Sequence, residues 1–528
     1  MKHNINRIHF VGIGGSGMSG IAEVMHNLGY FVSGSDIQES LVTSRLKEIG
    51  IKIFINHAAD NIKDVDVLVI SSAIDQDNPE LKAAITNKIP IMPRAEMLSE
   101  LMRFKKGIAV AGTHGKTTTT SLIASILAEA SMDPTYVIGG RLSSLNANAK
   151  LGNGEYIVVE ADESDASFLH LTPVYSIVTN IDQDHMETYD NDFEKLKKTY
   201  IEFIHRLPFY GVVIVCIDDP VIKSILPEIS RPIITYGLSN DADVHAEEVL
   251  ADAGKMHFKV TIKHTDVVKK PMTLNLPGKH YVRNALAAIA LADELEIPIS
   301  KTIDALKHFK GVGRRFETYK DLIFDKKSFT LVDDYGHHPV EIEAVLDAAR
   351  DAYPGKSIYL VFQPHRYTRT RDCFDEFVRV LQKADKTLLT DIYSAGEKVI
   401  PGVSSIAIMD SMNKIMKKVS FEKDILHLLN FLPEGCRAIF NLFAIEGYPH
   451  KEIAVMLSIS EGTSKSQLNF ARKKLQELLV NYLGLYIIPP YFSSEISLKT
   501  KSFSFKEGSF FDITLSIFSI LIRLFFAS

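Results

Sequence analysis

Short apolar runs recur along the chain, and most of them end in glycine or polar residues that open a helix-forming stretch. Apolar runs of this kind are typical of strands buried on both faces of a parallel sheet, with the helical stretches as crossovers. The alternation therefore predicts an α/β fold with parallel sheets. The runs that carry this prediction are Ile8–Ile13, Phe31–Asp36, Val65–Ser71, Gly107–Ala111, Tyr156–Glu160, Tyr175–Asn180, Phe329–Asp334 and Ser357–Phe362.

The first run leads into a glycine-rich turn over 12–17, Gly-Ile-Gly-Gly-Ser-Gly, which has the spacing G-x-G-x-x-G. A helix is expected over 18–28, and the next strand ends at Asp36, which is the βαβ context of a nucleotide or diphosphate site. Taken alone, the motif favours a NAD-dependent dehydrogenase with Asp36 on the ribose. Ser71 and Ser72 end another buried run, at the strand end where such sheets bind ligands.

A second glycine turn, over 112–118, reads Gly-Thr-His-Gly-Lys-Thr-Thr and stands between an apolar run and a helix-forming stretch. Backbone N–H groups in such a turn converge on an anion, Lys116 can reach the outer phosphates, and Thr117 can bind Mg²⁺. The strict spacing G-x-x-x-x-G-K-[ST] is not met, because Val110 stands where the first glycine belongs. A turn that binds nothing is the alternative, and the lysine with its threonines favours phosphate binding.

Two further strand ends carry acids, in Glu160-Ala-Asp-Glu-Ser-Asp165 and in Asn180-Ile-Asp-Gln-Asp-His185. An acid at a strand end beside a phosphate loop is a usual way to hold Mg²⁺, so Glu160 and His185 are the predicted metal ligands besides Thr117. The alternative for each is a polar strand end that contacts solvent. Asn284 is polar near the start of an alanine-rich helix that otherwise reads as core.

Later motifs add basic and aromatic groups. The run that ends at Asp333 and Asp334 is followed by Tyr335-Gly-His-His-Pro339, and a further run ends in a loop over 363–371 with three arginines and a histidine. Arginines in a loop at the carboxyl end of a parallel strand suit anionic groups, whereas a solvated basic face is the alternative.

Composition limits the functional classes. The chain has 528 residues, 46% of them hydrophobic and 23% charged, as in an ordinary globular protein of several domains. The net charge of −6 gives no argument that the chain as a whole binds nucleic acid, so any nucleic-acid site must be a local basic patch. Three scattered cysteines and a polar N-terminus without a signal peptide predict a cytoplasmic protein.

Together these motifs, with His280-Tyr-Val-Arg-Asn284, resemble the Mur ligase family. The turn that ends in Met18 is similar to the branch that adds L-alanine to UDP-N-acetylmuramate in peptidoglycan precursor synthesis. The resemblance implies that the first domain binds the UDP-sugar and not NAD, and that ATP and Mg²⁺ are required. It also implies that the sugar carboxylate attacks the γ-phosphate of ATP, and that the amine of L-alanine displaces phosphate from the resulting acyl phosphate.

The resemblance assigns roles to residues of this chain. For the UDP-sugar it implies Gly12, Gly14, Gly15, Ser16, Gly17, Met18, Asp36, Ser71 and Ser72. For ATP it implies Gly112, Thr113, His114, Gly115, Lys116, Thr117, Thr118, Asn284, Arg315, Asp333 and Asp334. For the metal it implies Thr117, Glu160 and His185, and for the amino-acid and sugar carboxylates Tyr335, His337, Arg366 and Arg369. Catalytic roles fall to Lys116, His185, Arg315 and His337.

The resemblance stops at about Lys417, where the family continues with a strand that ends in Gly-Ala-Gly-Asp and this chain does not. We therefore expect a Rossmann-like UDP-binding domain (1–104), a P-loop ATPase-like central domain (105–312) and a truncated Rossmann-like third domain (313–417). A truncated sheet exposes an edge and core surface, which predicts reduced stability and impaired activity.

Residues 418–480 are expected to form a small all-α helix-turn-helix domain, with helices over 432–443, 448–457 and 461–475. This segment resembles region four of extracytoplasmic-function sigma factors, which implies promoter DNA and RNA polymerase as partners. No counterpart of the other sigma regions occurs, so the resemblance stops short of a working sigma factor, and a helical bundle with a solvated basic face is the alternative. The implied DNA contacts are Thr463, Ser464, Lys465, Gln467 and Arg472.

The tail over 481–528 is unassigned, and its end is apolar apart from Asp512 and Arg523, which weakens a membrane span. We interpret the tail as out-of-frame or intergenic sequence, and hypothesise that a gene fusion or an assembly accident joined the two patterns, because both are incomplete where they meet. Long-read sequencing of the native locus that finds one expressed, uninterrupted frame would contradict this hypothesis.

Overall fold

The computed structural model describes residues 5–71, 74–142, 147–324, 327–415, 419–422, 432–440, 450–457, 459–482 and 522–527. They divide into two compact units, which meet in sequence between Arg315 and Phe316. Helices alternate with mainly parallel strands through most of both units, which confirms the predicted α/β class.

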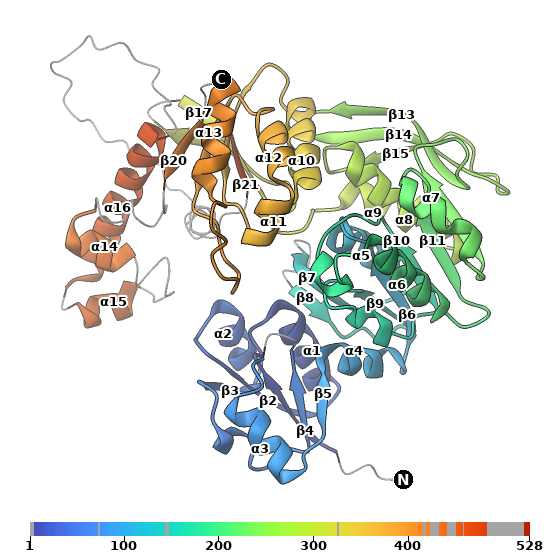
Figure 1. The fold of residues 1–528 in the computed structure, drawn as a ribbon, viewed down its shortest axis with the longest axis horizontal. Coiled ribbons are helices and arrows are strands. Elements are labelled where there is room, and N and C mark those ends of the chain that lie inside the picture. The colour runs from blue at the N-terminus through green and yellow to red at the C-terminus, as the bar shows by residue number, and fades with distance from the viewer. Residues whose placement is uncertain are drawn as a thin grey trace. The chain divides into compact units, whose positions relative to one another are not determined.

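The first unit begins with a five-stranded parallel sheet in the order β3-β2-β1-β4-β5 (Figure 1). Parallel strands need crossovers, and helices or a helical turn supply them here. The strands are β1 (Arg7–Val11), β2 (Phe31–Asp36), β3 (Lys52–Ile55), β4 (Val67–Ile70) and β5 (Ile91–Pro93). The helices are α1 (Ser16–Asn27), α2 (Leu41–Glu48), α3 (Pro79–Asn87) and α4 (Arg94–Met102), with the turn η1 (Ala59–Ile62).

The same unit continues with a ten-stranded sheet in the order β15-β14-β13-β12-β11-β10-β6-β9-β7-β8. Its parallel part runs from β7 to β13, and β14 and β15 extend it beyond β13 as an antiparallel ribbon. The strands are β6 (Lys106–Ala111), β7 (Thr135–Leu142), β8 (Ala147–Lys150), β9 (Tyr156–Glu160), β10 (Tyr175–Val178), β11 (Val212–Cys216), β12 (Ile233–Gly237), β13 (Val244–Asp252), β14 (Lys255–Ile262) and β15 (Lys270–Leu274).

Helix α5 is the central helix of this part, because most of its side chains are buried and it packs against both α8 and α9. The alanine-rich α8 is buried along most of its length, so small side chains allow the close helix packing that the sequence suggests. The helices are α5 (Lys116–Glu129), α6 (Phe193–His205), α7 (Pro220–Ile225), α8 (Lys279–Glu294) and α9 (Ile299–His308), with the turns η2 (Ser167–His170), η3 (Met186–Tyr189) and η4 (Leu226–Glu228).

The second unit contains a six-stranded sheet in the order β16-β17-β21-β18-β19-β20. Its strands are β16 (Glu317–Phe324), β17 (Lys327–Asp334), β18 (Ser357–Phe362), β19 (Lys386–Thr390), β20 (Val419–Glu422) and β21 (Ile522–Ala527). Its helices are α10 (Pro339–Ala352), α11 (Tyr367–Asp372), α12 (Phe374–Leu381) and α13 (Ser405–Ile415).

Strand β21 comes from the tail that the sequence left unassigned. It lies antiparallel between β17 and β18, where Leu524 is in register with Val332 on one side and Leu360 on the other. We expected an open sheet edge in this domain, and the structure differs at this place. Without β21, the edges of β17 and β18 that face each other would lack hydrogen-bond partners. Any extended segment long enough to lie between them can supply these partners, because the backbone groups are the same in every family.

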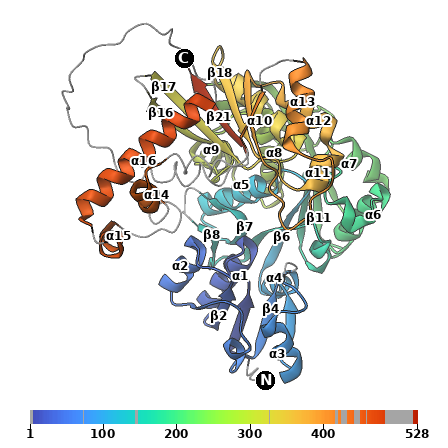
Figure 2. The ribbon, with the colours of Figure 1, turned by 60° about the vertical axis from the view of Figure 1, so that its left-hand side comes forward.

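Between β20 and β21, the part of the chain that the structure describes contains three helices: α14 (Glu434–Phe440), α15 (His450–Met456) and α16 (Glu461–Tyr482). Helix α16 packs against both of the others, and Figure 2 shows it as the longest of the three. It continues beyond the expected end at residue 475, because the following residues, Gln-Glu-Leu-Leu-Val-Asn-Tyr, include no glycine or proline that would end it.

The substitution Leu524→Pro tests whether β21 supports the third sheet. Proline removes a ladder hydrogen bond and is not tolerated in a central strand, so the melting temperature of the second unit should fall by several degrees. Circular dichroism during thermal unfolding of the full-length chain measures this change. Leu524→Val keeps the backbone donor and should melt within a degree or two of the parent chain. Equal melting of all three proteins would mean that β21 contributes no stability.

Candidate functional site

The turn after β6 is compressed against its neighbours, and glycine is required at two of its positions. Gly112 has a φ of +127°, and a Cβ atom there would overlap the hydroxyl of Thr179. Gly115 directly precedes α5 with a φ of +85°, and a Cβ atom there would lie 2.7 Å from Oδ1 of Asn284. The structure therefore brings Asn284, predicted only from its place near a helix start, directly against the phosphate-type loop.

The end of β10 braces the same turn from the other side. Oδ1 of Asn180 accepts the His114 N–H at 2.8 Å, and the Asn180 carbonyl accepts the Thr113 N–H at 3.1 Å. The Thr179 hydroxyl and the Asn180 amide both donate to the His114 carbonyl, at 2.6 and 2.9 Å. These bonds fix the loop backbone before any ligand binds, which is the preorganisation that anion binding requires.

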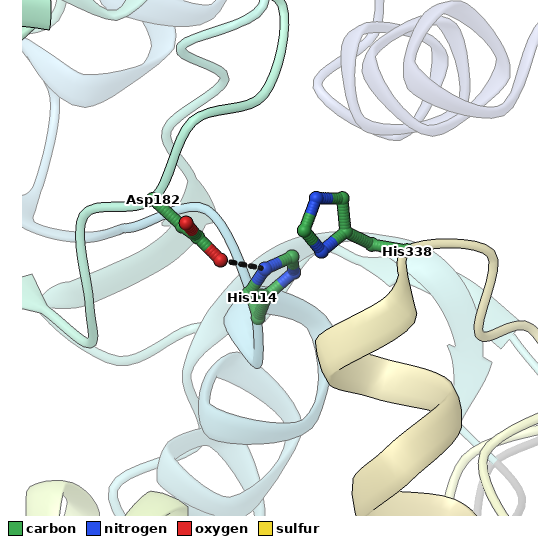
Figure 3. A group of neighbouring side chains, drawn as sticks. All are labelled: His114, Asp182 and His338. Carbon is green, nitrogen blue, oxygen red and sulfur yellow. Dashed lines mark hydrogen bonds and ion pairs between the residues drawn. The ribbon is translucent and has the colours of Figure 1, made fainter. Parts of the chain in front are cut away.

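The His114 side chain lies 3.3 Å from Asp182, between Nε2 and Oδ2, so the two motifs also meet through an imidazole and a carboxylate (Figure 3). His338, also labelled in Figure 3, belongs to the second unit, where it precedes α10. Asp182 was not among the predicted site residues, because nothing local separates it from the other acids of its loop.

Lys116 is almost enclosed by acceptors. Its Nζ donates to the Gly112 carbonyl at 2.6 Å, to the Thr113 carbonyl at 3.2 Å and to Glu163 at 2.7 and 2.9 Å. Burial lowers the pKa of this ammonium, but the carboxylates of Glu163 and Asp162 outweigh burial, so the pKa of Lys116 is raised. A phosphate that binds Lys116 has to exchange with Glu163, a residue the sequence analysis did not single out.

Carboxylates outnumber ammonium groups around this lysine. Glu160 accepts the Gly139 N–H at 2.7 Å and the Thr117 hydroxyl at 3.3 Å, and burial raises the pKa of this carboxyl. Burial likewise raises the pKa of Glu163 to about 7, although Lys116 lowers it. A cluster of buried carboxylates beside a threonine hydroxyl has the oxygen donors and the excess negative charge that suit a hard divalent cation. The residues present therefore fit Mg²⁺.

Other predicted residues of this unit take the following places. Thr118 is buried in the first turn of α5, and Arg315 is close enough for its charge to lower the pKa of Glu160. The ring of His185 lies 3.6 Å from Asp184, between Nε2 and Oδ2, and His185 precedes η3. The η3 residue Tyr189 donates its hydroxyl to the Glu163 carbonyl, so the segments of the two acidic motifs are tied together.

The first glycine turn is held by the end of β2. The Ser35 carbonyl accepts the N–H groups of Gly12 and Ile13 at 2.8 and 3.0 Å, and Asp36 accepts the Gly14 N–H at 2.8 Å. The carboxylate of Asp36 thus orders the loop backbone. Ser71 lies beside the turn, 4.0 Å from the place of a Cβ at Gly12. Helix α1 begins at Ser16 after an uncapped Gly15, Met18 is buried, and Ser72 lies outside the described residues.

A buried carboxylate, Glu80 of α3, binds Ser35, the residue whose carbonyl holds the first glycine turn. It accepts the Ser35 hydroxyl at 2.5 Å and the Asn61 amide at 2.6 Å, and it lies 3.3 Å from His57 Nδ1 and 3.6 Å from His9 Nε2. Burial raises the pKa of Glu80, but the neighbouring His9 and the hydrogen bonds from Ser35 and Asn61 together outweigh burial and lower the pKa to about 2. Glu80 therefore joins α3 to three other segments of the first sheet.

In the second unit, His365 contacts two of the predicted carboxylate-binding residues, His337 and Arg369. His365 lies 5.5 Å from the ring centre of His337 and is stacked on Tyr393 at the same distance. Arg369, which is buried, reaches His365 Nδ1 at 3.2 Å, and Tyr335 meets His337 edge to face. His365 and Tyr393 are therefore members that the sequence analysis missed, although His365 lies in the arginine loop.

Arg366 and the two aspartates of β17 have structural partners. Arg366 lies 3.8 Å from Glu397, which also binds the backbone and hydroxyl of Thr368. Asp334 accepts the N–H groups of Phe316 and Gly336, at 2.8 and 2.7 Å, and Asp333 is fully buried. Asp334 thus has both oxygens engaged by the backbone that enters and leaves the sheet.

The helix-turn-helix prediction requires one correction. Ser464 is fully buried and its hydroxyl lies 2.8 Å from His450 Nδ1, because Ser464, Leu468 and Ala471 form the inner face of α16. Ser464 is therefore not placed to contact DNA. Ser460 caps the helix start by accepting the Thr463 N–H at 3.0 Å, and Lys465 is exposed and lies 2.8 Å from Glu461. Gln467 lies near Gly435 of α14, and the side chain of Arg472 lies outside the described residues.

Among the helices that the structure describes, none combines the length and the apolar character needed to cross a membrane.

Comparison with known proteins identifies four matching segments. Residues 7–106 match the Mur ligase family catalytic domain, 110–292 the Mur ligase middle domain, and 314–432 the Mur ligase, glutamate ligase domain. Residues 422–475 match Sigma-70, region 4. The sigma-type match overlaps the end of the third ligase match, close to the place where the ligase motifs stop.

Whole-protein relatives agree with these matches. The UDP-N-acetylmuramate–L-alanine ligase of Methylobacillus flagellatus is 62% identical over 401 residues, which cover 76% of this chain and 84% of that protein. The corresponding ligase of Delftia acidovorans is 59% identical over 75% of this chain and 84% of its own. The crystal structure of the UDP-N-acetylmuramate–alanine ligase from Thermotoga maritima is similar with a TM-score of 0.69 at 31% identity, covering 81% and 93% of the two chains.

Glu80→Gln tests the buried network beneath the first glycine turn. A carboxyl whose pKa falls from 4.5 to about 2 on folding contributes roughly 3 kcal/mol at neutral pH, and this contribution is lost as pH falls from about 5 to 2. Glu80→Gln should therefore unfold at lower urea concentration than the parent chain at pH 7, and the gap should narrow between pH 5 and pH 3.5. A gap that is constant over this range would mean that the charge of Glu80 is not what stabilises the network.

Proposed function

The chain belongs to the Mur ligase family, and from this premise we propose that it joins L-alanine to UDP-N-acetylmuramate through the two glycine turns and the residues around them. It is an ATP-dependent ligase. The observation that carries the proposal is the Lys116 loop, which Thr179 and Asn180 hold in place beside the buried carboxylates of Glu160 and Glu163. We place the reaction in the cytoplasm, where ATP is available.

The first turn is the proposed UDP-sugar site. Its backbone N–H groups and the start of α1 offer donors to a diphosphate, and Ser35 with Asp36 holds them in position. We propose the same UDP-sugar-binding residues that were predicted from the sequence, including Ser71 and the glycines of the turn. Asp36, which orders the loop, is proposed to act through it.

The second turn is the proposed ATP site. Lys116 leaves Glu163 for the outer phosphates and spreads the charge that develops as the sugar carboxylate attacks the γ-phosphate. Asn284 and the threonines position the nucleotide, and Arg315 adds positive charge. Thr117, Glu160 and His185 are the proposed Mg²⁺ ligands, and a bound Mg²⁺ would neutralise phosphate charge.

The third site gathers Tyr335, His337, Arg366 and Arg369 for the carboxylates, and we add His365 because it contacts two of them. Arginine suits a carboxylate because its planar fork can donate two parallel hydrogen bonds. Here the amine of L-alanine displaces phosphate from the acyl phosphate and forms the amide.

Phosphate release by the full-length chain tests the ligase. With ATP, Mg²⁺, UDP-N-acetylmuramate and L-alanine we expect release that disappears when any one of them is omitted. Lys116→Ala should lower the rate by about 100-fold or more, because a donor to the transition-state charge is lost. Lys106→Ala is the matched control: this exposed lysine begins the same strand, pairs with Glu155 and should leave the rate unchanged. Full activity of Lys116→Ala would contradict the assigned role.

A second function is proposed for the region-four module: α16 binds promoter DNA, with RNA polymerase as the partner protein. Its support is the Sigma-70 match and the separation of faces on α16, where Ser464, Leu468 and Ala471 point inward and Lys465 lies outward. Thr463, Gln467 and Arg472 remain predicted contacts. The exposed ammonium group of Lys465 can bind a DNA phosphate. Such contacts release counterions, so they make the affinity for DNA depend on the salt concentration.

Fluorescence anisotropy of a labelled promoter duplex tests this module in the full-length chain. Lys465→Ala should weaken binding and lower the salt slope by about one, as expected for one lost phosphate contact. Glu461→Ala removes the acid that lies 2.8 Å from Lys465 and should strengthen binding. Unchanged affinity in both variants would show that this face of α16 is not the DNA-binding surface.

A further inference from the structure

Arg94, the first residue of α4, lies against Gly17 in the first turn of α1. A Cβ atom at Gly17 would be 2.9 Å from Nη1 of Arg94 and 3.2 Å from its Cδ. Gly17 thus makes room for the guanidinium, which would have to move if this position carried a side chain. The side chain of Arg94 is only 20% exposed, so the charge is held at the start of α1.

This is a costly place for a cation. The partial positive charge at the start of each helix repels it, and Arg94 stands at the start of α4 and beside the start of α1. The first turn of α1 contains no acidic residue, and Gly15 caps it without a side chain. Within the described residues, the ion pair of Arg94 is with Asp162, at 3.4 Å between Nη2 and Oδ2. One long contact uses little of the capacity of a group with five N–H donors.

We propose that Arg94 binds an anionic group of the UDP-sugar, together with the backbone N–H groups at the start of α1. The proposal rests on the proposed function, which places the UDP-sugar at this turn. Its chemistry is that of a guanidinium with a phosphate or carboxylate oxygen, for which the planar fork provides parallel donors. A bound anion would offset the positive charge of the arginine and the partial positive charge at the start of α1. This explains why an arginine stands at this otherwise unfavourable place.

Asp162 is then the anion that the substrate replaces. It lies between Arg94 and the Lys116 site, since the next residue, Glu163, binds Lys116. Substrate and Asp162 compete for the same guanidinium, so removing the charge of Asp162 should favour the substrate. A purely structural ion pair would behave differently, because loss of either partner would then weaken the site.

Isothermal titration of the full-length chain with UDP-N-acetylmuramate, without ATP, measures this competition. Arg94→Ala should weaken binding by about 10- to 100-fold, as expected for a lost charge-assisted hydrogen bond. Arg94→Lys, which keeps the charge without the fork, should fall between. Asp162→Asn should bind a few-fold more tightly than the parent chain. Arg103→Ala is the matched control, because this exposed arginine follows the last residue of α4 and pairs with Glu100.

Two further titrations identify the anion. UDP contains the diphosphate alone, and UDP-N-acetylglucosamine lacks the lactyl carboxylate. A loss in Arg94→Ala that extends to both of these ligands assigns the diphosphate, whereas a loss confined to UDP-N-acetylmuramate assigns the carboxylate.

The proposal is overturned if Arg94→Ala binds UDP-N-acetylmuramate as tightly as the parent chain does. It is also overturned if Asp162→Asn weakens binding as much as Arg94→Ala, which would make the ion pair structural. A parent chain that does not bind UDP-N-acetylmuramate at all would instead contradict the proposed function itself.

Discussion

The ordered backbone of the Lys116 turn depends on contacts that come from far along the chain. Thr179 and Asn180 at the end of β10 and Asn284 in α8 press on the turn so closely that Gly112 and Gly115 cannot carry a side chain. Because the turn is held from both sides, its N–H groups keep one arrangement without a ligand. Helix α5 continues from this turn and packs between the sheet and the helices α8 and α9.

Charge balance is the second constraint on this unit. Lys116 is surrounded by the carboxylates of the Glu160 motif, and their burial raises the pKa of both Glu160 and Glu163. An excess of buried negative charge is unfavourable unless cations offset it. Lys116, Arg94 and Arg315 do so in part, and a divalent cation at Glu160 would complete the balance. The cost of burying these acids is thus connected with the chemistry that they are proposed to support.

The second unit shows how a sheet can be completed by an unrelated segment. Strand β21 pairs in antiparallel register with both β17 and β18 and lies between them in the sheet. Such pairing depends little on side-chain identity, because every residue except proline offers the same donor and acceptor. The cluster of His337, His365, Tyr393 and Arg369 lies on loops and helix starts that follow strands of this sheet, so its geometry depends on the sheet being complete.

The local features of this protein were determined by sequence alone. An apolar run followed by a glycine turn and a helix former specifies its own conformation over a dozen residues, so the strands, the two glycine turns and the three C-terminal helices could be predicted. The partners across the fold could not. Lys116 and Glu163 are 47 residues apart and Arg94 and Asp162 are 68 apart, and nothing local marks either acid as the partner. Tertiary structure also decided the inward direction of Ser464 and the place of β21. These depend on helix phase and on which strand edge is unpaired, and both are properties of the assembled chain.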